Sequence, residues 1–157
     1  MKKIFIFFFF IINFVSTKSF AIEAEAGKWS FSKEENYCFI LSLPLKEEGN
    51  YDPANRGDTY VMVYKINKNP DPVVQINAGY KYKNDSEIIM VIDNTSFKLF
   101  SEGDDSAWSE KEDKKIVYAM KMGQNMTIKG TSSRGNPTKD TYTLLGFTSA
   151  FKKLNDC

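Results

Sequence analysis

The sequence predicts a mainly β protein, an antiparallel sandwich or barrel, that follows an N-terminal export signal. Three observations support this. After residue 27, apolar and aromatic runs of about four to eight residues recur at regular spacing. Polar turns rich in glycine, proline, asparagine and aspartate separate these runs. The chain also opens with a short apolar segment that is typical of a secretory leader.

Residues 1–21 have the three parts of a signal peptide. Met1–Lys3 is cationic, Ile4–Val15 is apolar except for one asparagine, and Ser19–Ala21 fits the small-x-small cleavage pattern. The apolar run is shorter than the roughly 20 residues that a membrane-spanning helix needs. The competing interpretation is an uncleaved anchor or a buried helix.

Cleavage is expected after Ala21, with Ala24 and Ala26 as alternative positions because they show the same pattern. The absence of a nearby cysteine disfavours a lipoprotein. Residues 22–157 then form a single domain of typical size, with 18 basic and 20 acidic residues and a net charge of −2. This balance argues against nucleic acid or an anionic membrane as the main partner.

The chain contains no histidine, which limits its chemistry. Ser-His-Asp and Cys-His catalysis are excluded in their usual forms. Most zinc sites and haem ligation are disfavoured, so we expect no metal and no cofactor. Carboxylate-based hydrolysis and lysine-based chemistry stay open.

The expected strands follow one another from Trp29 onward. Ile88–Ile92 is apolar on both faces and is expected to be central in its sheet, whereas residues 46–57 are polar and are expected to form a long loop. The other expected strands are Trp29–Ser32, Tyr37–Leu43, Tyr60–Ile66, Val73–Tyr80, Phe97–Phe100, Met126–Gly130 and Thr141–Leu144.

Two segments predict helices. Asp113–Met122 has apolar residues at helical spacing, with Asp113 as the expected N-cap and Gly123 as the expected left-handed end. Near the C-terminus, apolar residues recur at i, i+3, i+4 and i+7, which predicts an amphipathic helix. These residues are Phe147, Ala150, Phe151 and Leu154.

Two cysteines, Cys38 and Cys157, remain after cleavage. An even number in an exported chain favours one disulfide, which would close a loop of about 120 residues and join the terminal helix to the first strand region. In the chain-entropy model such a loop is worth about 4–5 kcal/mol. Two free thiols, or a cysteine-based active site without a histidine base, are the alternatives.

The C-terminal third resembles the invasion-associated locus B family. The similarity lies in Gly130–Gly135 and in the string Asp140–Ala150, which reads Asp-Thr-Tyr-Thr-Leu-Leu-Gly-Phe-Thr-Ser-Ala. Ala107-Trp108 and Ile116–Gly123 fit the family, as do Trp29 and Cys38. The resemblance covers most of the mature chain and is least clear over residues 44–80.

The resemblance implies an immunoglobulin-like β-sandwich with short helices, exported to the periplasm or outer envelope of a Gram-negative bacterium. No catalytic residues or cofactors are established for the family. Its founding members are linked to bacterial entry into host cells, a role that does not transfer automatically to this chain.

Three groups of residues are candidate sites. The first is the loop with Ser132, Ser133, Arg134 and Asp140, where a guanidinium among hydroxyls could hold a carboxylate, phosphate or sugar. Its alternative is a turn in which Arg134 pairs with Asp140. The second is the acidic stretch 102–106, a Ca²⁺ candidate or a solvated turn. The third is a set of tyrosines that could stack on sugars or anchor a protein partner, with half-buried packing as the alternative: Tyr37, Tyr51, Tyr60, Tyr64, Tyr80 and Tyr82.

We therefore expect an exported envelope protein that works as a non-catalytic binding module for an unidentified envelope or host protein or glycan. One alternative is a host-directed invasion or adhesion factor, which would need a large exposed apolar patch. The other is a small hydrolase, which would need two carboxylates converging in a cleft, one with a shifted pKa. Its candidate acids are Asp93, Asp104, Asp105 and Asp140.

Overall fold

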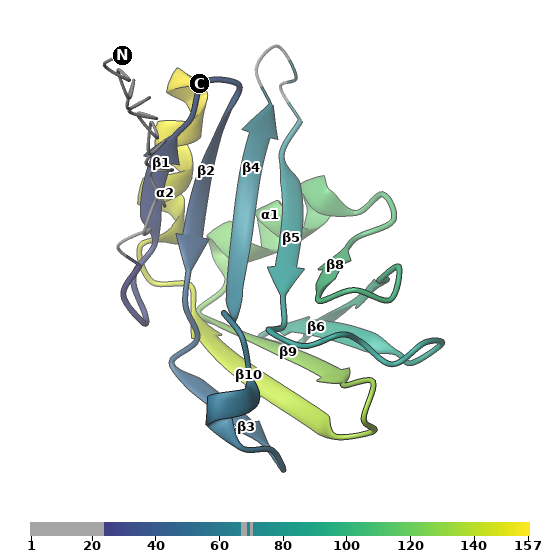
Figure 1. Ribbon diagram of the computed structural model, residues 1–157. Coiled ribbons are helices and arrows are strands. Elements are labelled where there is room, and N and C mark those ends of the chain that lie inside the picture. The colour runs from purple at the N-terminus through teal and green to yellow at the C-terminus, as the bar shows by residue number, and fades with distance from the viewer. Residues whose placement is uncertain (1–23, 67–68, 70) are drawn as a thin grey trace, which may run out of the picture.

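A computed structural model describes residues 24–66, 69 and 71–157, and the predicted leader lies outside them. The described chain forms two antiparallel five-stranded sheets and two α-helices, the second near the C-terminus (Figure 1). The prediction of a mainly β, sandwich-like fold with two short helices is confirmed.

The first sheet stands upright in Figure 1, with the strand order β1-β2-β4-β5-β8. Its strands are β1 (Ser30–Lys33), β2 (Tyr37–Ser42), β4 (Tyr60–Ile66), β5 (Val73–Asn77) and β8 (Ser106–Trp108). Side chains alternate between its two faces, so Val61 and Val63 of β4 point into the core.

The second sheet crosses below the first, with the order β3-β10-β9-β6-β7 (Figure 1). Its strands are β3 (Lys46–Gly49), β6 (Ile88–Ile92), β7 (Thr95–Leu99), β9 (Asn125–Thr131) and β10 (Pro137–Thr143). The segment expected to be central, β6, pairs with β9 and β7 and therefore lies next to the edge strand. Only its alternate residues are buried.

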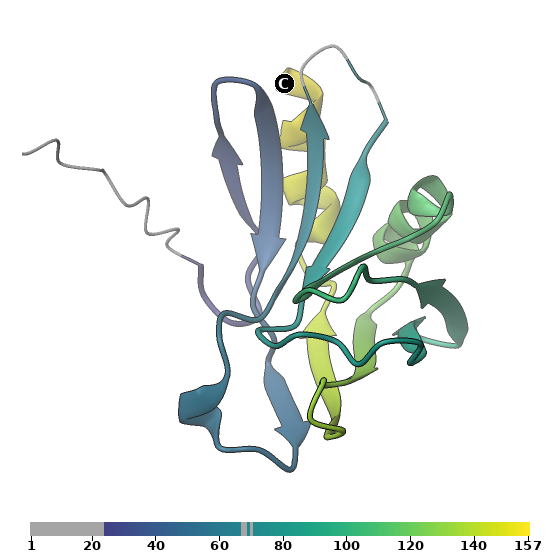
Figure 2. The ribbon, with the colours of Figure 1, turned by 45° about the vertical axis from the view of Figure 1, so that its right-hand side comes forward.

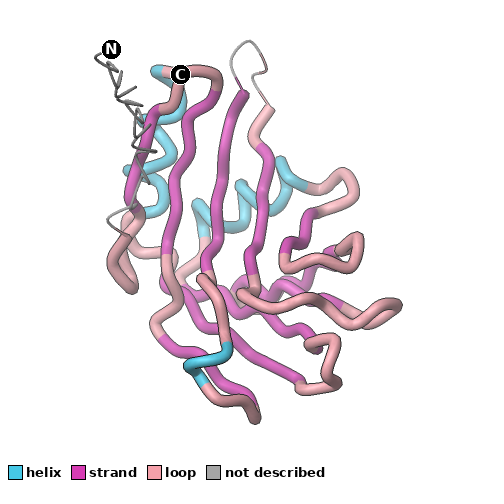
Figure 3. Tube along the Cα trace, viewed as in Figure 1, coloured by secondary structure: helices cyan, strands magenta, loops and turns pink. Residues whose placement is uncertain are grey.

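Helices α1 (Asp113–Met122) and α2 (Phe147–Lys153) lie against the same face of the first sheet (Figures 2 and 3). A short 3₁₀ helix, η2 (Leu154–Asp156), follows α2. The predicted apolar stripe of the terminal helix is buried, because Phe147, Ala150, Phe151 and Leu154 all join the core.

Both sheets and both helices share one hydrophobic core. Tyr142 of β10 and Met90 of β6 are fully buried in it beside Ile40 of β2 and Ile116 of α1. The expected disulfide joins Cys38 of β2 to Cys157, whose Cα atoms are 5.8 Å apart. It fixes the end of the terminal helical segment to the first sheet.

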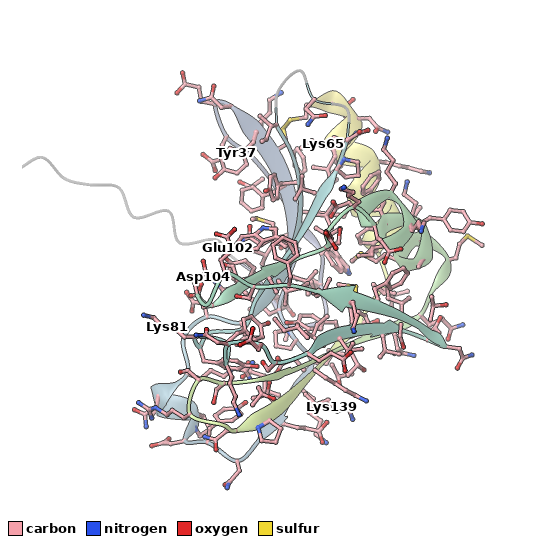
Figure 4. All side chains as sticks on the ribbon, turned by 90° about the vertical axis from the view of Figure 1, so that its right-hand side faces the viewer. Tyr37, Lys65, Lys81, Glu102, Asp104 and Lys139 are labelled. Atoms are coloured by element: carbon pink, nitrogen blue, oxygen red, sulfur yellow. A yellow bond between two sulfur atoms is a disulfide. The ribbon has the colours of Figure 1, made fainter. Side chains whose placement is uncertain are left out.

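The other face of the first sheet carries several aromatic side chains. Figure 4 shows Tyr37 on the side away from the helices. Its ring stacks on Phe39 at 5.8 Å between centroids. Phe39 pairs across the strands with Tyr64, which therefore shares this face. Tyr60 lies on it too, because it is four residues from Tyr64 on the same strand.

The structure corrects three expectations. Residues 46–57 are not one loop, because they contain strand β3 and the 3₁₀ helix η1 (Pro53–Asn55). Asp113 does not cap α1; its carboxylate accepts a hydrogen bond from the backbone N–H of Val74 at 2.8 Å. Gly123 has φ −85°, so it is not left-handed.

Within residues 24–66, 69 and 71–157, no helix is both long enough and apolar enough to span a bilayer.

Candidate functional site

The site begins with the buried side chain of Arg56, which follows η1. Only 3% of this side chain is exposed, and the same holds for Asp140 on β10. The guanidinium binds the Asp140 carboxylate with both of its terminal nitrogens, Nη1 to Oδ1 at 2.9 Å and Nη2 to Oδ2 at 2.7 Å. Such bidentate pairs are the strongest and most directional of protein ion pairs.

Nε and Nη1 of Arg56 have further hydrogen-bond partners. Its Nε donates to the backbone carbonyl of Ala78 at 2.9 Å. Its Nη1 donates to Oη of Tyr51 at 2.6 Å and to Oε2 of Glu47 at 3.0 Å. The rings of Tyr51 and Tyr80 lie 5.0 and 5.2 Å from the guanidinium carbon.

Strand pairing explains why a cation is needed here. Glu47 of β3 and Asp140 of β10 are cross-strand partners. Like charges directly opposite each other destabilise a sheet. Arg56 bonds to both carboxylates, so its positive charge reduces their mutual repulsion, and the same contacts fix the 50–57 loop against β10.

Burial and pairing act in opposite directions on these charges. Burial lowers the pKa of Arg56, but the hydrogen bonds and the negative charge of Asp140 outweigh this and raise that pKa overall. Burial raises the pKa of Asp140 above its ordinary value, and the hydrogen bonds from Arg56 offset only part of that rise. A charged pair is the arrangement that satisfies both groups.

Two tight backbone contacts hold the surrounding loops. Gly79 has φ +67°, a conformation that favours glycine, and its carbonyl accepts a hydrogen bond from the N–H of Gly57 at 2.8 Å. The N–H of Ser133 donates to the carbonyl of Lys81 at 2.7 Å. The 50–57 loop, residues 78–82 and the β9–β10 turn therefore meet at one place.

A pocket of about 260 Å³ opens where these three segments meet. We call it the hairpin pocket. It is lined by Tyr51, Asp52, Asn55, Arg56, Tyr80, Ser132, Arg134, Asn136 and Thr138. Two of these residues are aromatic and the other seven are polar or charged, so the lining offers a polar ligand both hydrogen-bonding groups and a stacking surface.

The structure brings together part of the predicted loop site. Ser132 and Arg134 line the hairpin pocket, whereas Ser133 is exposed and is not part of its lining. Asp140 lies behind the pocket, in contact with Arg56.

The proposed pairing of Arg134 with Asp140 is wrong. Asp140 is buried and its two oxygens are held by Arg56, whereas Arg134 is exposed at the turn. Within the described part of the chain, no residue forms a hydrogen bond or ion pair with the Arg134 side chain.

The acidic stretch 102–106 is a closed turn. Asp104 Oδ1 accepts hydrogen bonds from the N–H of Ser106 at 3.0 Å and the hydroxyl of Ser101 at 3.3 Å. Glu102 and Asp104 lie well apart from Lys139 (Figure 4). Among the described residues, no group of three or more cysteine, aspartate or glutamate side chains is placed to hold a metal ion.

Sequence reasoning missed Arg56, Tyr51 and Tyr80 as one unit. Arg56 lies in a segment whose composition indicates only a loop. The signal that could have identified it is the alternation of Thr138, Asp140 and Tyr142 on one strand face. A carboxylate between two inward residues requires a cation, and the chain has only two arginines.

Comparison with known protein families identifies the chain. The family model described as "Invasion associated locus B (IalB) protein" matches residues 29–155, which include both sheets, both helices and the hairpin pocket. The chain belongs to the invasion-associated locus B family. No curated protein and no solved structure matches the chain.

Two conclusions follow from membership of the invasion-associated locus B family. Proteins of this family are exported, which indicates an exported envelope protein. The family is not a known family of enzymes. The predicted signal peptide itself lies outside the described residues and stays a prediction.

Proposed function

We propose that this invasion-associated locus B protein is a non-catalytic binding module of the bacterial envelope, with the hairpin pocket as its contact site. The observation that carries the proposal is an unpaired guanidinium, that of Arg134, at a pocket walled by Tyr51 and Tyr80. The rigid Arg56–Asp140 pair holds these walls in place.

The carboxylates named for a hydrolase support the same conclusion. Asp93 accepts hydrogen bonds from the backbone of Gln124 and Asn125, on a turn between β6 and β7. Asp104 and Asp105 hold their own turn, because Asp104 accepts a hydrogen bond from the N–H of Ser106 and Asp105 accepts one from the Ser106 hydroxyl. Asp140 is covered and bound to Arg56 through both oxygens. A hydrolase needs two carboxylates that face a shared substrate position, and these acids hold protein atoms instead.

A steric block tests the proposal. Asn136 lies at the pocket and its side chain forms no hydrogen bond with a described residue, so Asn136→Trp should fill the opening without breaking a side-chain hydrogen bond. Ser133→Trp is the matched control, because it adds the same ring to the same turn outside the pocket. Immobilised mature protein, residues 22–157 with its disulfide formed, is incubated with envelope extract.

The expected result is a component retained by the wild type and by Ser133→Trp and lost by Asn136→Trp. Circular dichroism verifies that all three proteins are folded. Identical retention by Asn136→Trp, no component above the bare support, or chemical conversion of the retained component would each overturn the proposal.

A further inference from the structure

Most polar atoms around the hairpin pocket are already used inside the protein. Each nitrogen of the Arg56 guanidinium donates to at least one protein acceptor. The hydroxyls of Tyr80 and Thr138 bond to each other at 2.6 Å. Both carboxylate oxygens of Asp52 accept hydrogen bonds from the Pro53–Asn55 helix. The hydrogen-bonding groups that have no partner inside the protein therefore indicate which groups a ligand must provide.

On the side of the pocket formed by the β9–β10 turn, the hydrogen-bonding groups without a partner are mainly donors. The Arg134 guanidinium has no partner among the described residues. The Ser132 Oγ accepts from the N–H of Asn136 at 3.2 Å, which leaves its own proton free. The side-chain amide of Asn136 adds further N–H donors. A guanidinium beside a hydroxyl and an amide fits an acceptor with two oxygens, such as a carboxylate.

The facing wall has a different character. The Asn55 amide donates to Asp52 at 3.3 Å, so its Oδ1 is a free acceptor. Tyr51 and Tyr80 supply aromatic surface on the same side as Arg56. Aromatic surface with an adjacent acceptor suits a hydroxylated ring that has one apolar face.

Charge and size narrow the class further. Asp52 lines the pocket, and Glu47 and Asp140 lie behind Arg56, so three carboxylates accompany the two arginines. These groups carry a net charge of −1, so a doubly charged phosphate is repelled about twice as strongly as a single carboxylate, whose one charge Arg134 can pair. The volume of about 260 Å³ is below the roughly 300–1,000 Å³ of drug-sized sites and suits one sugar ring.

We propose that the hairpin pocket binds an acidic sugar. The carboxylate of the sugar binds Arg134, Ser132 and Asn136, and the sugar ring packs against Tyr51 and Tyr80. This inference rests on the proposed binding function. It adds a ligand class to the same site and makes Arg134 the residue that selects for charge.

Calorimetric titration of the oxidised mature protein tests the class with four probes: glucuronate, glucose, glucose 6-phosphate and N-acetylalanine. Glucuronate should bind saturably and at least about tenfold more tightly than each of the others, because only it offers both a single carboxylate and a hydroxylated ring. Binding should weaken as salt is raised, since the ion pair is at the surface.

Arg134→Gln should weaken glucuronate binding by about tenfold or more and leave glucose unaffected. The affinity of Arg134→Lys for glucuronate should lie between those of the wild type and Arg134→Gln, because lysine keeps the charge and loses the bidentate geometry. Lys129→Gln is the matched control, since Lys129 is exposed on β9 outside the pocket lining and its loss changes the net charge equally. Amide chemical shifts of residues 132–136 should move in the wild type on titration.

The outcomes separate the two proposals. The acidic-sugar class is overturned if N-acetylalanine, glucose 6-phosphate or glucose binds more tightly than glucuronate. It is also overturned if Arg134→Gln and Lys129→Gln weaken glucuronate binding equally. If pocket-dependent retention from envelope extract persists in that case, the binding function stands. If glucuronate does not bind and Asn136→Trp retains the same material as the wild type, both fail.

Discussion

Arg56 and Asp140 are both buried, so each charge depends on the other for its stability in the fold. Breaking a buried ion pair by removing one partner leaves an uncompensated charge. Asp140→Asn keeps the shape of the side chain and removes its charge. We expect it to lower the free energy of unfolding by about 3 kcal/mol, measured by urea denaturation of the oxidised protein.

Glu47→Gln is the control for this prediction. The Glu47 side chain is 39% exposed and is a secondary partner of the same guanidinium. Its loss should change the unfolding free energy by about 1 kcal/mol or less. If Asp140→Asn were as stable as Glu47→Gln, the bidentate pair would not be the anchor of the 50–57 loop.

At this scale the sequence predicts only part of the candidate site. Ser132 and Arg134 are identifiable because a guanidinium among small polar residues is a local pattern. The alternation of Thr138, Asp140 and Tyr142 indicates that Asp140 needs a cation, but no pattern near residue 56 shows that Arg56 supplies it. Its partner Asp140 lies 84 residues away, and the pairing exists only after β3 and β10 meet.

Among the elements, helix α1 ends at a glycine that is required by close packing and not by a left-handed backbone conformation. Gly123 has an ordinary φ of −85°. A Cβ atom there would lie 2.7 Å from Cγ2 of Ile92 and 3.0 Å from the carbonyl oxygen of Ala119. Glycine is needed because the helix end approaches β6 closely, not because the backbone is left-handed.

Gly123→Ala should therefore lower the unfolding free energy by about 1–3 kcal/mol through crowding. The measurement is a double-mutant cycle with Ile92→Ala, which removes the facing methyl group. The effect of Gly123→Ala should be smaller in that background. Equal effects in both backgrounds would exclude crowding against Ile92 as the cause.

Elements with apolar periodicity are the ones that the sequence predicts well. Strands β4 and β6 and helix α1 begin and end at the predicted residues. Strand β3 reads Lys-Glu-Glu-Gly and has no buried residue, so it carries no hydrophobic pattern. Strand β10 starts four residues before the predicted Thr141, because its first inward positions are polar side chains that bond to Tyr80 and Arg56.

For the whole molecule, two buried tyrosines set a limit at high pH. The hydroxyls of Tyr82 and Tyr142 are buried without a hydrogen-bond partner among the described residues. Burial raises the pKa of both well above the ordinary value. Below the unfolded-state pKa of about 10, both states keep the proton and stability is unaffected. Above it only the unfolded chain loses protons, so stability falls as the pH rises.

We expect cooperative unfolding above about pH 10, with tyrosinate absorbance from these residues appearing only as the near-ultraviolet circular dichroism is lost. Tyr142→Phe should shift the midpoint to higher pH, because it removes one of the two groups. Tyr118→Phe is the control, since Tyr118 is 68% exposed. Ionisation of all tyrosines with the circular dichroism intact would contradict the prediction.

The disulfide joins residues that are 119 positions apart, so the covalent ring encloses most of the domain. A protease that nicks an exposed segment inside this ring, such as the turn at residues 133–135, cuts the chain without releasing a fragment. The nicked protein would run as one band on a non-reducing gel and as two after reduction. In a compartment shared with proteases, cleavage of a loop would thus leave the two pieces of the chain joined by the disulfide, and cleaved molecules could persist beside intact ones.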